Sequence, residues 1–278
     1  PHVALLAIVH GNELSGAIVL DRLLRAGLRP ARGRLTFGFV NLAAFDQFDP
    51  RQPTLSRFVD EDLNRVWDEA TLVGPRRSLE LDRARELRPL IDTIDVVLDL
   101  HSMLWESDPL LLCGESPQGR DLALAIGVPE LVVADGGHAG GRRLIDYARF
   151  RTPDNPAAVL TEAGQHWEPA TVATAAASVA GLLRAEDMLT GDGTEFGLPP
   201  PAPPQPRLAE VTMAITATTT AFAFVQPWRG GTIVPRRNTL LALDGASEIR
   251  TPHDNCLLVM PSLRPTRGHT AVRLARFV

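Results

Sequence analysis

Three apolar runs in this sequence lead into side chains that can bind a metal ion or move a proton. The first run is followed directly by His10, and Glu13 comes three residues later. The second run ends at His101, and the third contains Glu162 near its end. A single histidine after an apolar run is most often a solvated loop residue. Three such features in one chain favour a shared site.

These residue types match the ligands of a catalytic zinc ion. Two histidines and one carboxylate, here His10, His101 and Glu13, form a common zinc shell that leaves a fourth position for water. Imidazole nitrogen and carboxylate oxygen suit such an ion without a thiolate. The ion lowers the pKa of water toward 7, so that a nucleophile exists at neutral pH. A second carboxylate must then accept the proton, and Glu162 is the candidate general base.

The stretch FVDEDLNRVW, residues 58–67, contains a candidate anion-binding pair. The planar guanidinium of Arg65 suits bidentate capture of a carboxylate, and Asn64 precedes it. Arg57 adds a second cation in the same stretch. A surface ion pair between Arg65 and a neighbouring aspartate is the simpler alternative.

The elements that would position these side chains alternate between strands and helices. We expect strands over 2–9, 33–42, 95–100, 109–113, 130–134 and 157–164, and helices over 14–27, 78–92, 119–127 and 168–189. This alternation predicts an α/β fold with a largely parallel or mixed sheet. Ligands bind beyond the carboxyl ends of the strands in such sheets. If the three strands are neighbours, His10, Glu13 and His101 therefore converge.

The composition changes sharply after the last predicted helix. Residues 191–207 contain six prolines and are typical of a stiff linker. Residues 208–278 are rich in threonine, valine and turn residues and contain no convincing helix. We therefore predict an α/β domain over 1–190 and a small all-β domain after the linker.

The bulk properties exclude several classes of protein. The formal net charge of −5 does not favour a nucleic-acid partner. No apolar run approaches the roughly 18 residues of a membrane span. The two cysteines, Cys113 and Cys256, are too few for a disulfide framework, which favours a cytoplasmic protein. The sequence leaves open a homo-oligomer, and also a segment before Pro1 because the chain begins without methionine.

Four short motifs together resemble a known family. HGNELSG (10–16), DLNR (62–65), DLHS (99–102) and TEAG (161–164) occur in the order typical of the succinylglutamate desuccinylase/aspartoacylase family, a group of zinc-carboxypeptidase-like hydrolases. The match covers about the first 190 residues. It implies a carboxypeptidase-like mixed sheet flanked by helices, followed by a small all-β C-terminal domain.

The resemblance also implies roles for the residues at the matching positions. His10, Glu13 and His101 correspond to the ligands of one zinc ion per chain. Glu162 corresponds to the catalytic acid/base. Arg57 corresponds to an arginine that helps to polarise the scissile carbonyl in the aspartoacylase branch.

Substrate binding is only partly covered by the resemblance. Asn64 and Arg65 correspond to the pair that grips a substrate carboxylate. The aspartoacylase branch has further substrate arginines and tyrosines, but Arg149 and Arg151 do not align cleanly with them. Tyr147 is the single tyrosine of the chain, so no tyrosine from the C-terminal part can contribute.

Three further polar residues have two interpretations each. Asp99 lies two residues before His101 and is equally suited to orient an imidazole or to cap backbone. His138, in the glycine-rich stretch DGGHAGG, could border the pocket, but a mobile surface position is the more frequent outcome. The same holds for His166, just after TEAG.

We therefore predict a zinc-dependent deacylase that cleaves the amide bond of a small N-acyl amino acid or a related compound. In this mechanism metal-activated water attacks the acyl carbon with Glu162 as the base. One alternative is a zinc carboxypeptidase that acts on peptides. The other is a catalytically inactive family member that binds a ligand.

Overall fold

The computed structural model of the chain describes residues 1–138, 140–152, 156–201, 203 and 205–278. Its strands are β1 (His2–Ala7), β2 (Arg34–Phe39), β3 (Val96–Met103), β4 (Leu110–Leu112), β5 (Leu131–Ala134), β6 (Ala157–Gln165), β7 (Arg207–Thr216), β8 (Phe222–Phe224), β9 (Ile233–Val234), β10 (Leu240–Asp244), β11 (Ser247–Arg250), β12 (Cys256–Val259) and β13 (Thr270–Phe277). Ten of them form one mixed sheet in the order β2-β1-β3-β6-β4-β5-β7-β13-β12-β9. Strands β11, β10 and β8 form a second, antiparallel sheet in that order.

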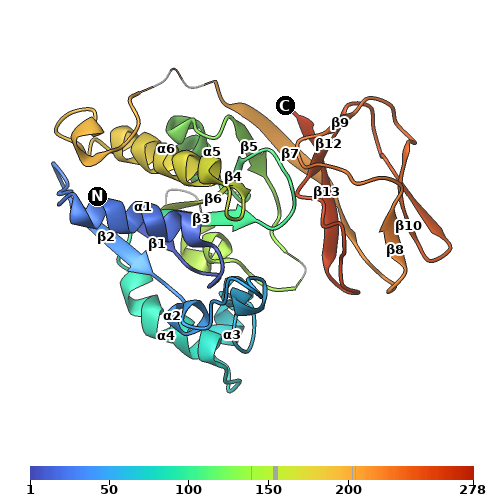
Figure 1. Cartoon of the computed structure of the whole chain (residues 1–278), viewed down its shortest axis with the longest axis horizontal. Coiled ribbons are helices and arrows are strands. Elements are labelled where there is room, and N and C mark those ends of the chain that lie inside the picture. The colour runs from blue at the N-terminus through green and yellow to red at the C-terminus, as the bar shows by residue number, and fades with distance from the viewer. Residues whose placement is uncertain (139, 153–155, 202, 204) are drawn as a thin grey trace.

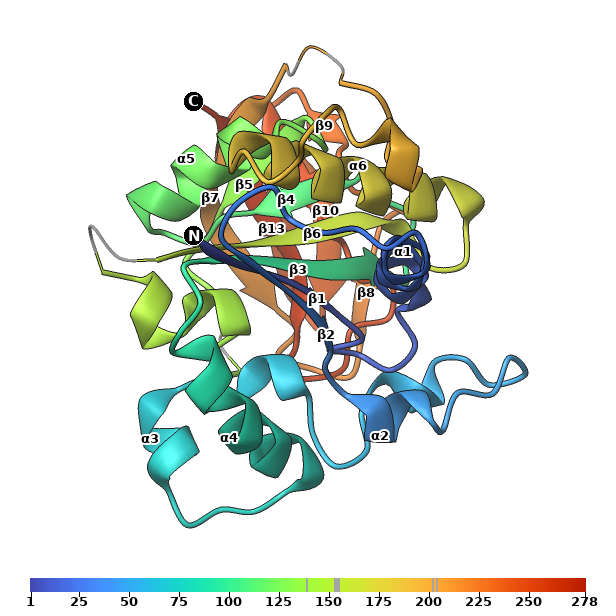
Figure 2. The same ribbon diagram turned by 90° about the vertical axis from the view of Figure 1, so that its left-hand side faces the viewer.

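Helices cover both faces of the large sheet. They are α1 (Leu14–Arg25), α2 (Leu42–Phe45), α3 (Glu69–Val73), α4 (Leu79–Ile91), α5 (Pro117–Ile126) and α6 (Pro169–Ala185). Helices α1, α5 and α6 lie on one face, whereas α3 and α4 lie on the other, as Figures 1 and 2 show. Strands β1 and β3 are buried along their whole lengths, as expected for parallel strands covered on both sides. The predicted α/β class is confirmed.

Local sequence signals explain where two of the helices begin. The Ser78 side chain accepts a hydrogen bond from the Leu81 amide at the start of α4. Ser116 does the same for Gly119 at the start of α5, where Pro117 occupies the first helical position. These serines satisfy amide groups that would otherwise lack a partner, and proline lacks the amide hydrogen altogether. Both helices were predicted to within two residues of their observed starts.

The three strands that carry the candidate site are adjacent and parallel. β1 pairs with β3, and β3 pairs with β6. Within the second pair, His101 lies opposite Glu162. The carboxyl ends of these strands therefore meet at one edge of the sheet, which confirms the expected convergence.

Element ends differ from the prediction where the backbone turns. β1 ends at Ala7 rather than residue 9, because Ile8 adopts a left-handed backbone conformation with φ of 57°. Such a conformation is unfavourable for a β-branched residue, and it is maintained here by the surrounding fold. α6 ends at Ala185, four residues early, before Asp187 with φ of 51°.

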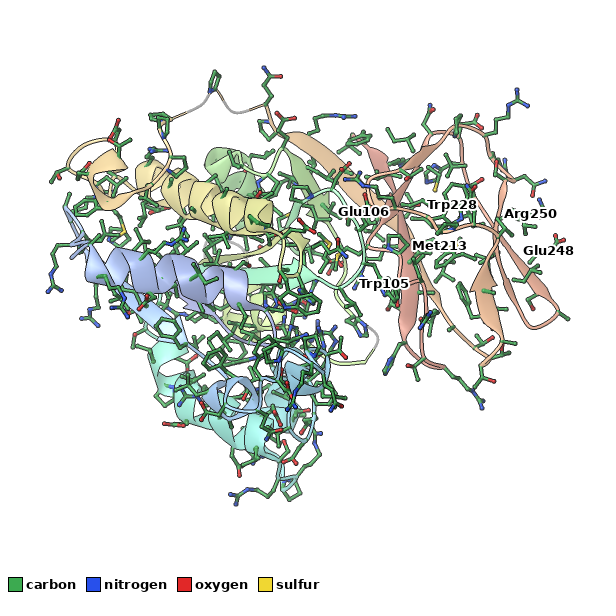
Figure 3. The ribbon with its side chains drawn as sticks, in the orientation of Figure 1. Trp105, Glu106, Met213, Trp228, Glu248 and Arg250 are labelled. Carbon is green, nitrogen blue, oxygen red and sulfur yellow. The ribbon has the colours of Figure 1, made fainter. Side chains whose placement is uncertain are left out.

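The C-terminal segment is all-β, as predicted, but its strands continue the large sheet. β7 pairs in parallel with β5 and in antiparallel with β13. Trp105 and Glu106 lie where the α/β part meets the C-terminal strands (Figure 3), and Arg229 contacts Glu106 across that junction. The predicted linker includes a short turn, Thr194–Phe196, while its residues 202 and 204 lie outside the described residues. The division into two domains stays a prediction.

The helices do not include a membrane span. Among the residues that the structure describes, none forms a helix that is both long enough and apolar enough to cross a bilayer.

Candidate active site

His10 lies in a tight turn between β1 and α1. A side chain on the next residue, Gly11, would come within 2.4 Å of the Ala44 backbone and of the Ser56 carbonyl oxygen, so that glycine is required there. Glu13 occupies the position before α1, but its carboxylate does not cap the helix. The carboxylate instead contacts two imidazole rings.

His10, Glu13 and His101 form what we call the metal-ligand cluster. Glu13 Oε1 lies 2.8 Å from His10 Nδ1, and Glu13 Oε2 lies 2.8 Å from His101 Nδ1. The two Nδ1 atoms are 3.2 Å apart, and all three side chains are buried. Ligand atoms on one tetrahedral zinc ion lie about 3.3–3.5 Å apart. The cluster can therefore hold a metal ion after its side chains spread by only a few tenths of an ångström.

A carboxylate holds the outer nitrogen of each imidazole. Asp62 Oδ1 lies 2.9 Å from His10 Nε2, and Asp99 Oδ2 lies 2.9 Å from His101 Nε2. A carboxylate in this position keeps the proton on Nε2 and leaves Nδ1 free for a metal ion. Asp99 thus lies close enough to contact the His101 ring, but neither of its carboxylate oxygens has a hydrogen-bond partner among the described residues. Asp62 was not predicted, although its place at the head of the DLNR motif was a usable signal.

The charges of the cluster suit a divalent cation. Burial opposes ionisation of Glu13, yet the His10 and His101 imidazoles hold the pKa of its carboxyl well below the usual value. Burial lowers the pKa of His101, but the carboxylates of Asp99 and Glu13 outweigh it and raise that pKa well above normal. The carboxylates of Glu13, Asp62 and Asp99 thus surround the two imidazoles. A dication at this point would offset the excess of negative charge.

Arg57 extends over the cluster from a short helical turn, Leu55–Arg57. Its Nη1 lies 3.2 Å from Glu13 Oε1, and its Nη2 lies 3.2 Å from Asp62 Oδ2. The Arg57 side chain is 36% exposed, whereas the carboxylates that it contacts are largely buried. It therefore places a positive charge between the cluster and the open side of the site.

Glu162 lies on β6 beside His101 in the sheet. Its side chain is buried, and its Oε2 atom has no hydrogen-bond partner among the described residues. Burial, followed by repulsion from Glu13, raises the pKa of this carboxyl to about 8. Glu162 is thus a carboxyl group suited to exchange a proton near neutral pH.

Asn64 and Arg65 lie on a second short turn, Leu63–Arg65. Asn64 Oδ1 accepts a hydrogen bond from the Leu144 amide at 2.8 Å, while its Nδ2 group has no partner in the described part of the chain. Arg65 Nη1 donates to the Asn64 carbonyl oxygen at 2.6 Å. Burial, together with nearby guanidinium groups, lowers the pKa of Arg65 to about 10. Both side chains can therefore offer donors to an anion.

All seven predicted residues line one cavity of about 230 Å³. Its wall also contains residues that the sequence did not single out as site residues, which are Ser102, Met103, Leu104, Trp105, Leu112, Arg143, Leu160, Met260, Pro261, Ser262, Thr270 and Arg273. Seven of these come from the chain after the predicted strand 130–134. A cavity of this size suits a small molecule.

The two remaining predicted histidines are not free on the surface. His166 is buried, its Nδ1 lies 2.7 Å from Ser102 Oγ, and its amide donates to the Met103 carbonyl oxygen at 2.7 Å. The Ser102 amide in turn donates to Glu13 Oε2 at 3.1 Å. His138 lines the cavity, and burial lowers its pKa to about 3. The surface position expected for His166 was wrong, because Ser102 on the adjacent strand contacts its ring. His138 is half-buried and borders the cavity, which was its other predicted position.

The arginines of the cavity differ from the ones weighed in the sequence. Tyr147, Arg149 and Arg151 bond to groups elsewhere, and none of them is among the described residues of the cavity wall. Arg143 and Arg273 line it instead. Neither lies in a recognisable motif, so the sequence held no signal for them.

Comparisons with known proteins agree with this geometry. The succinylglutamate desuccinylase/aspartoacylase catalytic domain matches residues 1–184. Aspartoacylase from Xenopus tropicalis is 32% identical over 123 residues, which are 41% of this chain and 38% of that protein. The aligned part is thus well under two thirds of that relative.

Solved structures share the fold over the whole chain. Succinylglutamate desuccinylase from Vibrio cholerae has a TM-score of 0.70 at 20% identity, with 100% of this chain and 81% of that chain covered. A succinylglutamate desuccinylase/aspartoacylase from Rhodobacter sphaeroides has a TM-score of 0.71 at 19% identity, covering 100% and 86%. Murine aminoacylase 3 has a TM-score of 0.66 at 17% identity, covering 100% and 95%. Since the family match spans more than half of the chain, the protein belongs to the succinylglutamate desuccinylase/aspartoacylase family of amide hydrolases.

Proposed function

We propose that this protein is a zinc-dependent deacylase that hydrolyses the amide bond of a small N-acyl amino acid or a related compound. The observation that carries the proposal is the metal-ligand cluster in the same cavity as the unpaired carboxylate oxygen of Glu162. Family membership supports amide hydrolysis, and the cavity volume supports a small substrate.

Zinc would be held by the Nδ1 atoms of His10 and His101 and by the Glu13 carboxylate. When bound there, it supplies a Lewis acid that polarises a carbonyl group and lowers the pKa of water toward 7. Asp62 and Asp99 lie beside the Nε2 atoms of these rings, where their carboxylates would orient the imidazoles toward the ion.

Glu162 would transfer the proton of the reaction. As a carboxylate it takes a proton from the attacking water, whose oxygen forms the new bond to the acyl carbon. It then passes that proton to the nitrogen as the amide C–N bond breaks, giving a carboxylic acid and a free amine. The raised pKa of Glu162 suits both steps at neutral pH.

Three polar residues would hold the substrate. Arg65 and the free Nδ2 group of Asn64 bind a substrate carboxylate. Arg57 lies beside the cluster and stabilises negative charge that develops on the acyl oxygen. This arrangement fixes the scissile bond between the metal site and Glu162.

The proposal is tested with metal analysis and a substrate panel. We expect purified protein to contain zinc and to release free amine from at least one N-acetyl, N-succinyl or N-formyl amino acid. Removal of zinc by a chelator should abolish turnover, and added zinc should restore it. Cleavage of peptides in preference to every small amide would instead support a carboxypeptidase. Zinc binding without any turnover would support an inactive family member.

A further inference from the structure

Glu80 is a fully buried carboxylate that forms no ion pair. It occupies the second position of α4, and the residue is 0% exposed. Among the residues that the structure describes, no arginine or histidine forms a salt bridge with it. The positive end of the α4 dipole favours a negative charge at this position. A carboxylate removed from water also needs hydrogen-bond donors on its oxygens, and those donors identify what Glu80 holds.

The donors to Glu80 are mainly backbone amides of one short segment. Oε1 accepts a hydrogen bond from the Val59 amide at 2.7 Å. Oε2 accepts from the Asp60 amide at 3.0 Å and from the Glu61 amide at 3.2 Å. The Asn41 Nδ2 group donates to Oε1 at 3.2 Å. Hydrogen bonds to an ionised acceptor are stronger than neutral ones, so this carboxylate anchors three consecutive amides.

The anchored amides lie between two parts of the candidate active site. Arg57 precedes them by two residues, and Asn64 and Arg65 follow them closely in the same segment, 57–65. All three of these side chains line the cavity, whereas Glu80 is not among the described residues of its wall. Glu80 therefore acts on the site only through the backbone of this segment.

Other contacts between the 57–65 segment and the start of α4 are closer to solvent. Asp60 Oδ2 accepts a hydrogen bond from the Leu79 amide at 2.8 Å, but both residues are exposed. Ser78 Oγ donates to Glu61 Oε1 from a half-buried position. Water can replace an exposed contact at little cost, whereas loss of a buried acceptor leaves its donors without a partner. Glu80 is thus the buried link between α4 and this segment.

We propose that Glu80 is a positioning residue that fixes Arg57 relative to Asn64 and Arg65 in the proposed reaction. This inference rests on the proposed deacylase function and deepens it. In that reaction Asn64 and Arg65 hold the substrate carboxylate, while Arg57 stabilises charge on the acyl oxygen. One buried carboxylate holds the backbone between these groups, so their separation is fixed before the substrate binds. A displacement of about 1 Å at such groups lowers a rate by up to about 100-fold.

The test replaces Glu80 with a side chain of the same shape. Glu80→Gln keeps one acceptor oxygen, but its NH₂ group can only donate, so part of the donor set loses its acceptor. We expect kcat/KM for the best amide of the substrate panel to fall by about 10- to 100-fold, with KM raised and kcat lowered. Glu86→Gln, at a position 68% exposed on the same helix, is the matched control and should stay within about twofold of wild type.

A purely structural role would give a different result. It would lower the free energy of unfolding and the folded fraction, but it would leave the KM of the folded protein unchanged. Hydrogen exchange adds a local measurement, since Glu80→Gln should speed exchange in residues 58–62 while β1 and β3 keep their protection. Equal acceleration throughout the protein, or KM and kcat both within about twofold of wild type, would overturn the inference.

A binding measurement separates this inference from the proposed function. If no amide of the panel is hydrolysed, the deacylase proposal fails, and calorimetry of zinc-loaded protein with succinate decides the inference. Glu80→Gln should weaken succinate binding by about tenfold, because Asn64 and Arg65 are displaced. Equal affinity in wild type and Glu80→Gln would overturn the inference. If Glu80→Gln does not fold, Glu80→Asp, which keeps the charge but is one methylene shorter, takes its place in every experiment.

Discussion

Two buried charge clusters line the same cavity, and they are assembled in different ways. The metal-ligand cluster takes His10 and Glu13 from the turn between β1 and α1, and His101 from the adjacent strand β3. Its members are close to short motifs that can be read directly in the sequence. The second cluster consists of Asp135, Arg143 and Arg273, which we call the arginine cluster, and it joins the end of β5, the loop that follows and the distant strand β13. It forms only because the C-terminal strands extend the same sheet.

The clusters also differ in how completely their charges are paired. Each imidazole of the first cluster has an aspartate on its outer nitrogen, and Glu13 contacts both rings. In the second cluster, Arg143 is saturated by two aspartates, while Arg273 keeps free donors. The comparison shows that the metal-ligand cluster is built around local motifs, whereas the arginine cluster depends on long-range packing. The following experiments test that division, from the largest expected effect to the smallest.

If the metal-ligand cluster and Glu162 have separate roles, the reaction depends on Glu162 but metal binding does not depend on it. Glu162→Gln should lower kcat by about 10²- to 10⁴-fold, the usual contribution of a general base. The zinc content should stay that of the wild type, because Glu162 lies outside the metal-ligand cluster. Steady-state kinetics and metal analysis measure the two effects. Glu168→Gln, an exposed carboxylate six residues later, is the control, and a kcat within tenfold of wild type in Glu162→Gln would contradict the assigned role.

The arginine cluster should matter for stability more than for metal binding. Asp135→Asn leaves the buried guanidinium groups of Arg143 and Arg273 without their shared charge partner. The free energy of unfolding should fall by about 3–5 kcal/mol, as for other broken buried ion pairs. Urea unfolding measures this loss, with the exposed Asp121→Asn as control. A stability equal to that of the control would show that the cluster is not a structural link.

Loss of a carboxylate beside the metal-ligand cluster should have the opposite effect, with a larger change in metal affinity than in stability. Asp62→Asn keeps an acceptor for the Asn64 amide but removes the negative charge beside His10. Zinc affinity should fall by about 10- to 100-fold, while stability without metal changes less. Competition with a chelator of known affinity gives the measurement, and the exposed Asp46→Asn is the control. Unaltered zinc affinity would mean that Asp62 does not orient the ring.

The pH dependence of stability sharpens the same contrast. Burial opposes ionisation of Asp135, but Arg143 and Arg273 outweigh it and hold the pKa of its carboxyl below the usual value. The stabilisation from Asp135 is therefore complete above the ordinary aspartate pKa of about 3.9 and is lost as the pH falls through the lower value in the folded state. Urea unfolding of metal-free wild type and Asp135→Asn from pH 7 to pH 3 should show their stabilities converging at the acid end. A constant difference would contradict this assignment.

Much of the fold and of the first cluster could be predicted because the signals are local. Buried parallel strands are read from continuous apolar runs, and the starts of α4 and α5 from Ser78 and Ser116. The order in which β1, β3 and β6 lie side by side then brings His10 to His101. Local signals failed where the backbone departs from its favoured conformation, as at Ile8.

By itself, the sequence determined the class of fold, the ligands of the candidate metal site and the carboxyl group beside them. It did not indicate that His166 is buried against Ser102, or that Arg273 reaches the cavity from β13. The first placement depends on the pairing of β3 with β6, and the second on the pairing of β7 with β5 and with β13, so both join segments far apart in the chain. Hydrophobic periodicity and short motifs report on neighbours along the chain, whereas the partner of a buried charge is decided by the tertiary structure that encloses it.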